Sequence, residues 1–179
     1  MTYAELQSNT LAWQRALKFA GLYKGQLDGI TGPLTREAAA QWRESHKQLQ
    51  TRYGRLDKRT EDNLLTLQPL AALKVRQMMT ALRGLADWRL ICGLRTYDEQ
   101  DKLYAKRPKV TNARGGQSMH NFGIAADVCL FRGGVDIWAP SEGPDSIYKP
   151  VAALAHKLGL VWGGDWRSPY DPGHVQLGS

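Results

Sequence analysis

The stretch S-M-H-N-F-G-I-A-A-D-V-C-L-F, which runs from Ser118 to Phe131, decides how the second half of this chain folds. Its second part is an apolar run typical of a buried β-strand, but Asp127 interrupts that run. Burying a carboxylate costs several kcal/mol unless it is paired, hydrogen-bonded or bound to a metal. A bulge in the strand, an arginine partner or a bound metal ion would each account for an acid at this position.

A second acid and a second histidine occur close together near the end of the chain, in D-P-G-H-V-Q-L. His120, Asp127 and His174 supply two imidazoles and one carboxylate, which are the ligand types of a catalytic zinc site with one position left for water. Asp171 then remains as an unliganded carboxylate that can take and return a proton. The sequence contains no H-E-x-x-H, so the familiar helical zinc site is excluded.

Two other residues are candidates for substrate contact. Arg95 follows the apolar run W-R-L-I-C-G-L, and a guanidinium at a strand end can hold a carboxylate or an oxyanion. The alternative for Arg95 is an ordinary surface position, and Ser118 either contacts substrate or caps a turn. The remaining histidines, His46 and His156, are predicted to be surface residues.

The composition is that of a globular chain with excess positive charge. Of 179 residues, 42% are hydrophobic and 23% are charged, and the formal net charge is +7. This charge favours an anionic partner, but the basic residues are scattered, which argues against a nucleic-acid-binding arm.

No apolar run approaches the ~20 residues of a membrane span, and the polar N-terminus lacks a secretory signal pattern. Cys92 and Cys129 lie in apolar runs and are predicted to be buried free thiols.

Periodicity predicts two parts that meet near Gln68-Pro69. The first part is expected to contain three helices, over residues 9–23, 33–46 and 60–67, with Leu34 and Trp42 buried in the second. The second part is expected to contain two helices, 70–82 and 151–158, and four strands, 88–94, 124–131, 135–138 and 174–177. Gly133-Gly134 predicts a two-residue hairpin turn. Without a repeated βαβ rhythm, these elements indicate an α+β fold with a mostly antiparallel sheet flanked by helices.

The pattern S-x-H-x-x-G-x-A-x-D, from Ser118 to Asp127, resembles the signature of the zinc peptidases grouped with D-alanyl-D-alanine peptidases and hedgehog-type domains. The segment W-G-G-D-W-R-S-P-Y-D-P-G-H resembles the second half-site of that family. G-L-R-T-Y-D-E-Q-D-K-L-Y-A and V-T-N-A-R-G-G-Q-S are similar to its branch of L-alanyl-D-glutamate endopeptidases, which occur among phage endolysins and bacterial wall hydrolases. The resemblance implies one zinc ion held by His120, Asp127 and His174, with Asp171 as general base and acid. It also implies that Arg95 and Ser118 contact the substrate.

The first part of the chain resembles a three-helix peptidoglycan-binding module, through L-A-W-Q-R-A-L-K-F-A-G-L-Y-K-G-Q-L-D-G-I-T-G-P-L-T-R-E-A. The match weakens from Gln48 to Leu67. We therefore expect a wall-binding module over residues 1–67 and a zinc peptidase domain over residues 68–179. Such tethering raises the local substrate concentration, and the basic charge suits an anionic wall.

Together these resemblances imply a phage-type modular endolysin, a zinc metallopeptidase that cuts the L-alanyl-D-glutamate bond of peptidoglycan and lyses bacteria. A D-alanyl-D-alanine carboxypeptidase is the first alternative, and a non-enzymatic wall-binding relative and a nucleic-acid binder are weaker ones. The expected protein is a monomer that is made in the host cytoplasm without a signal peptide, binds neither nucleic acid nor membrane, and acts on the wall in the periplasm. By analogy with endolysins, its release would need a holin-type partner.

Overall fold

A computed structural model describes residues 1–137 and 147–178. Two small helices, α1 (Tyr3–Ser8) and α2 (Thr10–Phe19), precede the long α3 (Pro33–Tyr53), the short α4 (Lys58–Leu64) and α5 (Pro69–Leu82). The remaining elements are the strands β1 (Trp88–Cys92), β2 (Ala125–Arg132), β3 (Val135–Ile137), β4 (Leu160–Trp162) and β5 (His174–Leu177), and the helices α6 (Tyr97–Ala105) and α7 (Lys149–Lys157). Single 3-10 turns cover Met119–Phe122 and Gly163–Asp165.

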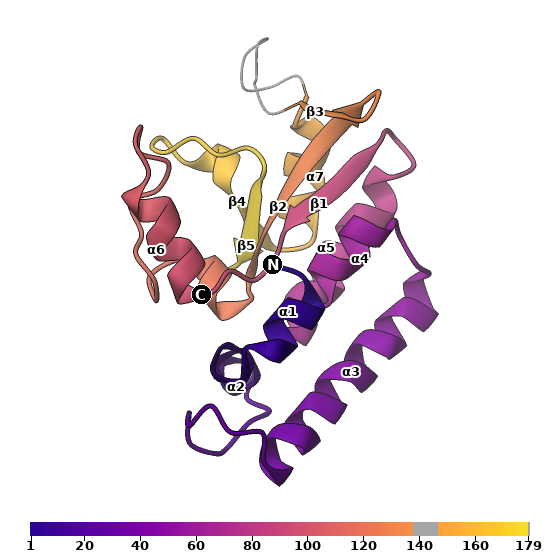
Figure 1. The fold of residues 1–179 in the computed structure, drawn as a ribbon. Helices are drawn as coiled ribbons and strands as arrows, with labels where there is room; N and C mark the ends of the chain where they lie inside the picture. The colour runs from indigo at the N-terminus through magenta and orange to yellow at the C-terminus, as the bar shows by residue number, and fades with distance from the viewer. Residues whose placement is uncertain (138–146, 179) are drawn as a thin grey trace.

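The sheet has the order β1-β2-β5-β4, every pair is antiparallel, and β3 extends β2 as a hairpin. α5 and α7 cover one face of this sheet (Figure 1). Their apolar side chains form one core with the strands, including Met78, Leu90, Val128 and Val151. The predicted α+β fold with a mostly antiparallel sheet is thereby confirmed.

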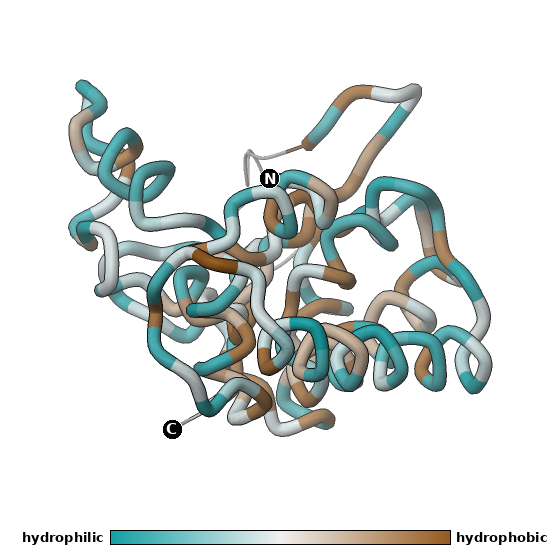
Figure 2. The backbone as a smooth tube through the Cα atoms, turned by 60° about the horizontal axis from the view of Figure 1, so that its bottom comes forward, coloured by the Kyte–Doolittle hydropathy of each residue, from teal (hydrophilic) through white to brown (hydrophobic). Residues whose placement is uncertain are grey.

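The hydrophobic residues of the helices alternate with hydrophilic ones, as expected for elements that bury one face (Figure 2). α1, α2 and α3 enclose a second, smaller core around Leu6, Trp13, Leu17 and Trp42. Trp13 and Trp42 meet edge to face, with ring centroids 5.1 Å apart. Leu94, which follows β1, also joins this helical core, so the two cores touch at the end of β1.

Several predicted boundaries need correction. The helix expected over 9–23 is α2, which ends at Phe19 and is capped by Asn9, whose side chain accepts a hydrogen bond from the Ala12 amide. α1, which precedes it, was not predicted. α3 continues beyond residue 46 to Tyr53, α4 begins and ends earlier than 60–67, and α6 and β4 were not predicted. The hairpin turn at Gly133-Gly134 is confirmed, with φ of 58° and 83°, whereas residue 138 of its second strand lies outside the described residues.

Two predictions about burial on α3 were wrong. Leu34 is 53% exposed and lies in the first turn of α3, outside both hydrophobic cores. His46 is only 1% exposed, and its Nε2 donates a hydrogen bond to the carbonyl of Leu67, 3.0 Å away. That bond places the ring between α3 and the segment that enters α5, instead of on the surface.

α4 and α5 are joined by a buried ion pair between Glu61 and Arg76, 2.7 Å apart at the closest atoms. Leu64 and Leu67 belong to the same core as the sheet, so side chains before residue 68 help to bury the strands. The division into a binding module and a catalytic domain at residue 67 stays a prediction. Within the part of the chain that the structure describes, no helix is both long and apolar enough to cross a membrane.

Candidate metal centre

Two neighbouring strands and one turn bring the predicted metal ligands together. Asp127 in β2 lies directly opposite His174, the first residue of β5. His120 comes from the 3-10 turn that leads into β2 and ends at Gly123, whose φ of 66° is in the left-handed region that favours glycine. The spacing of seven residues between His120 and Asp127 therefore spans one turn and the start of one strand.

The three side chains meet through one atom each. Asp127 Oδ1 is 3.2 Å from His120 Nε2 and 3.1 Å from His174 Nδ1. The two ring nitrogens are 3.3 Å apart. Three potential donor atoms thus surround one point. The arginine partner that could also compensate Asp127 is more distant, since Arg95 Nη2 lies 3.5 Å from Asp127 Oδ2.

The outward-facing nitrogens of both histidines are held by hydrogen bonds. His120 Nδ1 donates to the carbonyl of Gly93 at 2.7 Å, and His174 Nε2 donates to Oε1 of Gln176 at 3.0 Å. With these bonds in place, the neutral form of each ring has its other nitrogen, the one facing Asp127, available to bind a metal ion. Orientation of ligating histidines in this way is typical of metal centres, so the donor set fits a divalent ion such as zinc.

The electrostatics of the cluster follow from its packing. Burial lowers the pKa of His120, but the Asp127 carboxylate outweighs that effect and raises the pKa to about 10. Burial raises the pKa of Asp127, but His120 and His174 outweigh it and hold that pKa well below its usual range. These shifts describe an ion pair between the Asp127 carboxylate and a protonated His120, and a bound cation would take the place of the proton on His120 Nε2.

Asp171 lies beside this cluster, with a carboxylate oxygen within 4.8 Å of the donor atoms of Asp127 and His174. Burial, followed by the negative charge of Asp127, raises the pKa of Asp171. The same acid is held in the 163–174 segment, since its amide donates to the carbonyl of Gly163. A carboxylate with a raised pKa next to a metal site is suited to general base and acid chemistry.

Arg95 and Ser118 both face the groove that contains the cluster. Arg95 Nη1 donates to Oε1 of the buried Gln100 at 2.9 Å, which fixes the guanidinium beside Asp127. Ser118 precedes the 3-10 turn as its N-cap residue and also lines the groove, so the two interpretations of Ser118 are compatible.

The groove has a volume of about 960 Å³. Its walls include all six predicted site residues: Arg95, Ser118, His120, Asp127, Asp171 and His174. Trp166 also lines it, with its ring centroid 5.0 Å from that of His174. A groove of this size accommodates a short peptide segment.

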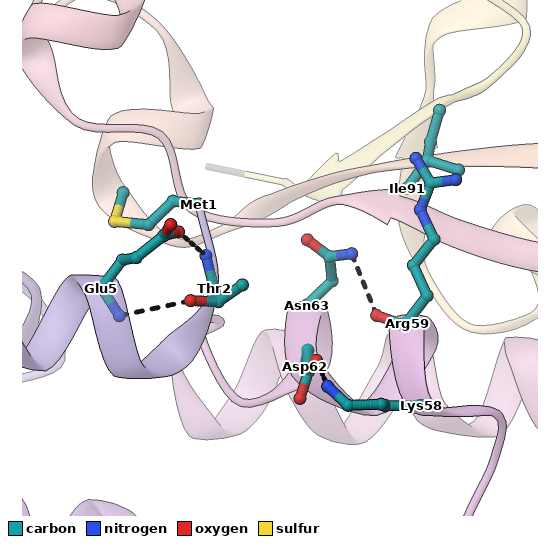
Figure 3. A pocket seen from close by; sticks show the side chains of 8 residues that line it. All are labelled: Met1, Thr2, Glu5, Lys58, Arg59, Asp62, Asn63 and Ile91. Carbon is teal, nitrogen blue, oxygen red and sulfur yellow. Dashed lines mark hydrogen bonds and ion pairs between the residues drawn. The ribbon is translucent and has the colours of Figure 1, made fainter.

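A different pocket, of about 410 Å³, lies where the start of α1, α4 and β1 meet (Figure 3). The polar groups drawn there are paired with one another: Thr2 with Glu5, Lys58 with Asp62, and the Asn63 amide with the Arg59 carbonyl. None of the predicted site residues lines it. The predicted metal ligands and substrate contacts therefore line the groove and not this pocket.

Sequence reasoning missed Gln176 and misjudged Cys92. Gln176 lies two residues after His174 in β5, so strand alternation places both side chains on one face, and that signal was available in H-V-Q-L. Cys129 is buried as predicted, but Cys92 is only partly buried, with Sγ 3.3 Å from Arg95 Nη2. The bulge in β1 between Leu90 and Cys92 turns that thiol towards the site, and nothing in the sequence indicates the bulge.

Residues 111–177 match the family described as D-alanyl-D-alanine carboxypeptidase, a peptidase M15 group. The peptidoglycan L-alanyl-D-glutamate endopeptidase CwlK of Bacillus subtilis is 36% identical over 118 residues, which cover 58% of this chain and 71% of that protein. The chain belongs to the M15 peptidase family. M15 peptidases are metal-dependent, which places this M15 member among the metallopeptidases.

The crystal structure of the Serratia marcescens L-Ala D-Glu endopeptidase ChiX has the same fold as this M15 peptidase. The TM-score is 0.53 at 28% identity, and the match covers 69% of this chain and 89% of ChiX. Both relatives are therefore peptidases whose names specify the L-alanyl-D-glutamate bond.

Proposed function

We propose that this M15 peptidase hydrolyses the L-alanyl-D-glutamate bond in the stem peptide of peptidoglycan, with one zinc ion held by His120, Asp127 and His174. The observation that carries the proposal is the convergence of His120 Nε2, Asp127 Oδ1 and His174 Nδ1 beside Asp171 in one groove. The names of the two relatives support the choice of bond.

When bound, the zinc ion supplies a Lewis acid that polarises the scissile carbonyl and makes water a better nucleophile near neutral pH. Asp171 takes a proton from the attacking water as a new C–O bond forms at the carbonyl of L-alanine. The same carboxyl then gives that proton to the nitrogen of D-glutamate as the C–N bond breaks. The raised pKa of Asp171 suits both halves of this transfer, because the proton must be released as readily as it is taken.

Arg95 and Ser118 are proposed to hold the substrate. The Arg95 guanidinium, fixed by Gln100, can donate hydrogen bonds to a carboxylate or to the oxygen on which negative charge develops. Stem peptides carry free carboxylates, so a cation at this place favours them over neutral peptides. The Ser118 hydroxyl lies on the same wall of the groove and can accept or donate one further hydrogen bond.

The biological setting proposed for this activity is that of a phage-type endolysin. In this proposal the helical N-terminal region, residues 1–67, binds peptidoglycan, and a net charge of +7 favours the anionic wall. The enzyme would act as a monomer on the wall in the periplasm, lyse the cell and depend on a holin-type partner to reach its substrate.

Mass spectrometry of digested peptidoglycan tests the proposal. We expect new N-terminal D-glutamate and C-terminal L-alanine, with no products from an Asp171→Asn variant. The second candidate, D-alanyl-D-alanine carboxypeptidase activity, is favoured by the description of the matching family and would release free D-alanine instead. Free D-alanine as the main product, or cleavage that persists in His120→Ala, contradicts the proposed function.

A further inference from the structure

The residues that connect α4 to α5 contact the backbone on both sides of His120. On one side, Thr66 Oγ1 accepts a hydrogen bond from the Leu94 amide at 2.9 Å. The residue before Leu94 is Gly93, whose carbonyl accepts the 2.7 Å hydrogen bond from His120 Nδ1. Thr66 is therefore one peptide unit away from the group that orients the predicted metal ligand.

On the other side, Gln68 holds the turn that carries His120. The Gln68 amide donates to the carbonyl of Gly123 at 2.8 Å, and Gln68 Nε2 donates to the carbonyl of Phe122 at 2.7 Å. The Gly123 amide in turn donates to the carbonyl of His120. The strand end and the turn are thus both bonded to the same three-residue segment, 66–68.

The approach between this segment and the strand end is unusually close. A Cβ atom at Gly93 would lie 2.3 Å from Thr66 Oγ1 and 2.6 Å from the carbonyl oxygen of Asn63, distances that no side chain tolerates. Glycine is required at this position for close backbone approach. The Gly93 carbonyl therefore has little freedom to move away from His120 while Thr66 is in place.

We propose that Thr66 and Gln68 are positioning residues of the peptidase: they hold the Gly93 carbonyl and the 119–123 turn so that His120 Nε2 faces Asp127 and His174. The inference depends on the proposed metal site and deepens it. It also extends the catalytic unit into the chain before residue 68, so the predicted wall-binding module and the metal site share a structural element.

α4 offers a matched control for Thr66. Thr60 is also fully buried, and its Oγ1 accepts a hydrogen bond from the Leu90 amide at 3.0 Å. The carbonyl of Leu90 accepts from the Asn63 side chain and not from a predicted ligand. Thr→Val at 60 and at 66 therefore removes the same kind of bond to β1 or its continuation, but only the bond at 66 adjoins the group that orients His120.

The experiment measures zinc affinity of the metal-free protein by competition with a chromophoric chelator, together with the melting temperature. For Thr66→Val we expect a rise in the zinc dissociation constant of about tenfold, in the range known for groups that support metal ligands. Thr60→Val should lower the melting temperature less than Thr66→Val, because Thr66 Oγ1 also donates to the Asn63 carbonyl at 2.7 Å, and should change the dissociation constant less than about twofold. Thr66→Ser should retain wild-type affinity because it keeps the hydroxyl.

Equal zinc affinities for Thr66→Val and Thr60→Val overturn the inference, whether both are unchanged or both are weakened. If Thr66→Val does not fold, Gln68→Met against Gln77→Met makes the same comparison, since Gln77 bonds only the distant Tyr53 hydroxyl among the contacts described. A wild-type protein that binds no zinc overturns the proposed function as well, whereas zinc binding that is insensitive to residues 66 and 68 overturns this inference alone.

Discussion

His174 and Asp127 face each other across adjacent antiparallel strands, and His174 Nδ1 lies 3.1 Å from Asp127 Oδ1. The register of β2 and β5 alone places this imidazole against this carboxylate, so two of the three proposed metal ligands are positioned by strand pairing. His120 completes it from outside the sheet, through a turn that ends at Gly123. The geometry of the site thus depends on strand register and on one tight turn.

Replacing Asp171 tests its proposed role in proton transfer. Asp171→Asn should lower kcat by about 10²- to 10⁴-fold, because the amide cannot accept the proton, while the melting temperature and the bound zinc stay near wild type. Peptidoglycan digestion rates, measured beside metal content, check this. Asp165→Asn is the control, since Asp165 is exposed and pairs with His156; equal rates for the two variants would contradict the role.

Gln176→Leu tests whether the hydrogen bond to His174 Nε2 supports metal binding. Without the acceptor, the ring loses its fixed tautomer, and we expect zinc affinity to fall by about 10- to 100-fold. Chelator competition measures the change. Gln77→Leu, which removes a hydrogen bond to Tyr53 on the helical side of the protein, should leave zinc affinity unchanged.

Removing the metal should reveal how far the two histidines and Asp127 depend on it. Dialysis against a strong chelator is expected to abolish peptidoglycan cleavage and lower the melting temperature, because a ligand bound only by the folded state stabilises that state. Added zinc should restore both quantities in the wild type but not in His120→Ala. Full cleavage by protein shown to be metal-free would exclude the proposed chemistry.

His46 predicts a pH dependence of stability that is separate from the metal centre. Burial lowers the pKa of His46 from 6.5 to about 4, so between these values the unfolded chain binds more protons than the folded one. The free energy of unfolding should therefore fall as pH drops below 6.5, by up to about 3 kcal/mol at pH 4.

Denaturation by urea at several pH values measures this contribution. His46→Gln retains a donor for the Leu67 carbonyl but does not titrate, so its stability should fall less steeply between pH 6.5 and pH 4. His156→Gln should follow the wild type, because His156 is largely exposed. The same slope for wild type and His46→Gln would contradict the prediction.

The strongest sequence signals were residues that break a pattern. Asp127 was detectable because an acid in an apolar strand needs compensation, and the structure supplies it from His120, His174 and, more weakly, Arg95. The burial of His46 was not detectable, because it depends on the Leu67 carbonyl, which lies far along the chain. Local periodicity describes one element at a time, whereas such contacts arise only when elements pack.

The same limit explains α1 and the positioning contacts of Thr66. α1 is a short helix stabilised by a capping box between Thr2 and Glu5, a signal weaker than the apolar stripe of α2. In the sequence, Thr66 has no feature that distinguishes it from other residues at a helix end. Only the hydrogen bond that its hydroxyl accepts from the Leu94 amide shows that it contacts the end of β1.

Phe19, at the end of α2, packs edge to face on Phe122 in the turn that carries His120, with ring centroids 4.7 Å apart. Leu94 is buried in the helical core, and Arg15 lies 4.4 Å from the centre of the Tyr97 ring. The helical region therefore packs directly against the part of the chain that contains the metal site, and its orientation relative to the groove is fixed by these contacts. If the helical region binds a glycan strand, the groove can reach only stem peptides at one distance and angle from the bound strand. The spacing of cleaved bonds along the wall would then be set by the fixed geometry of the protein.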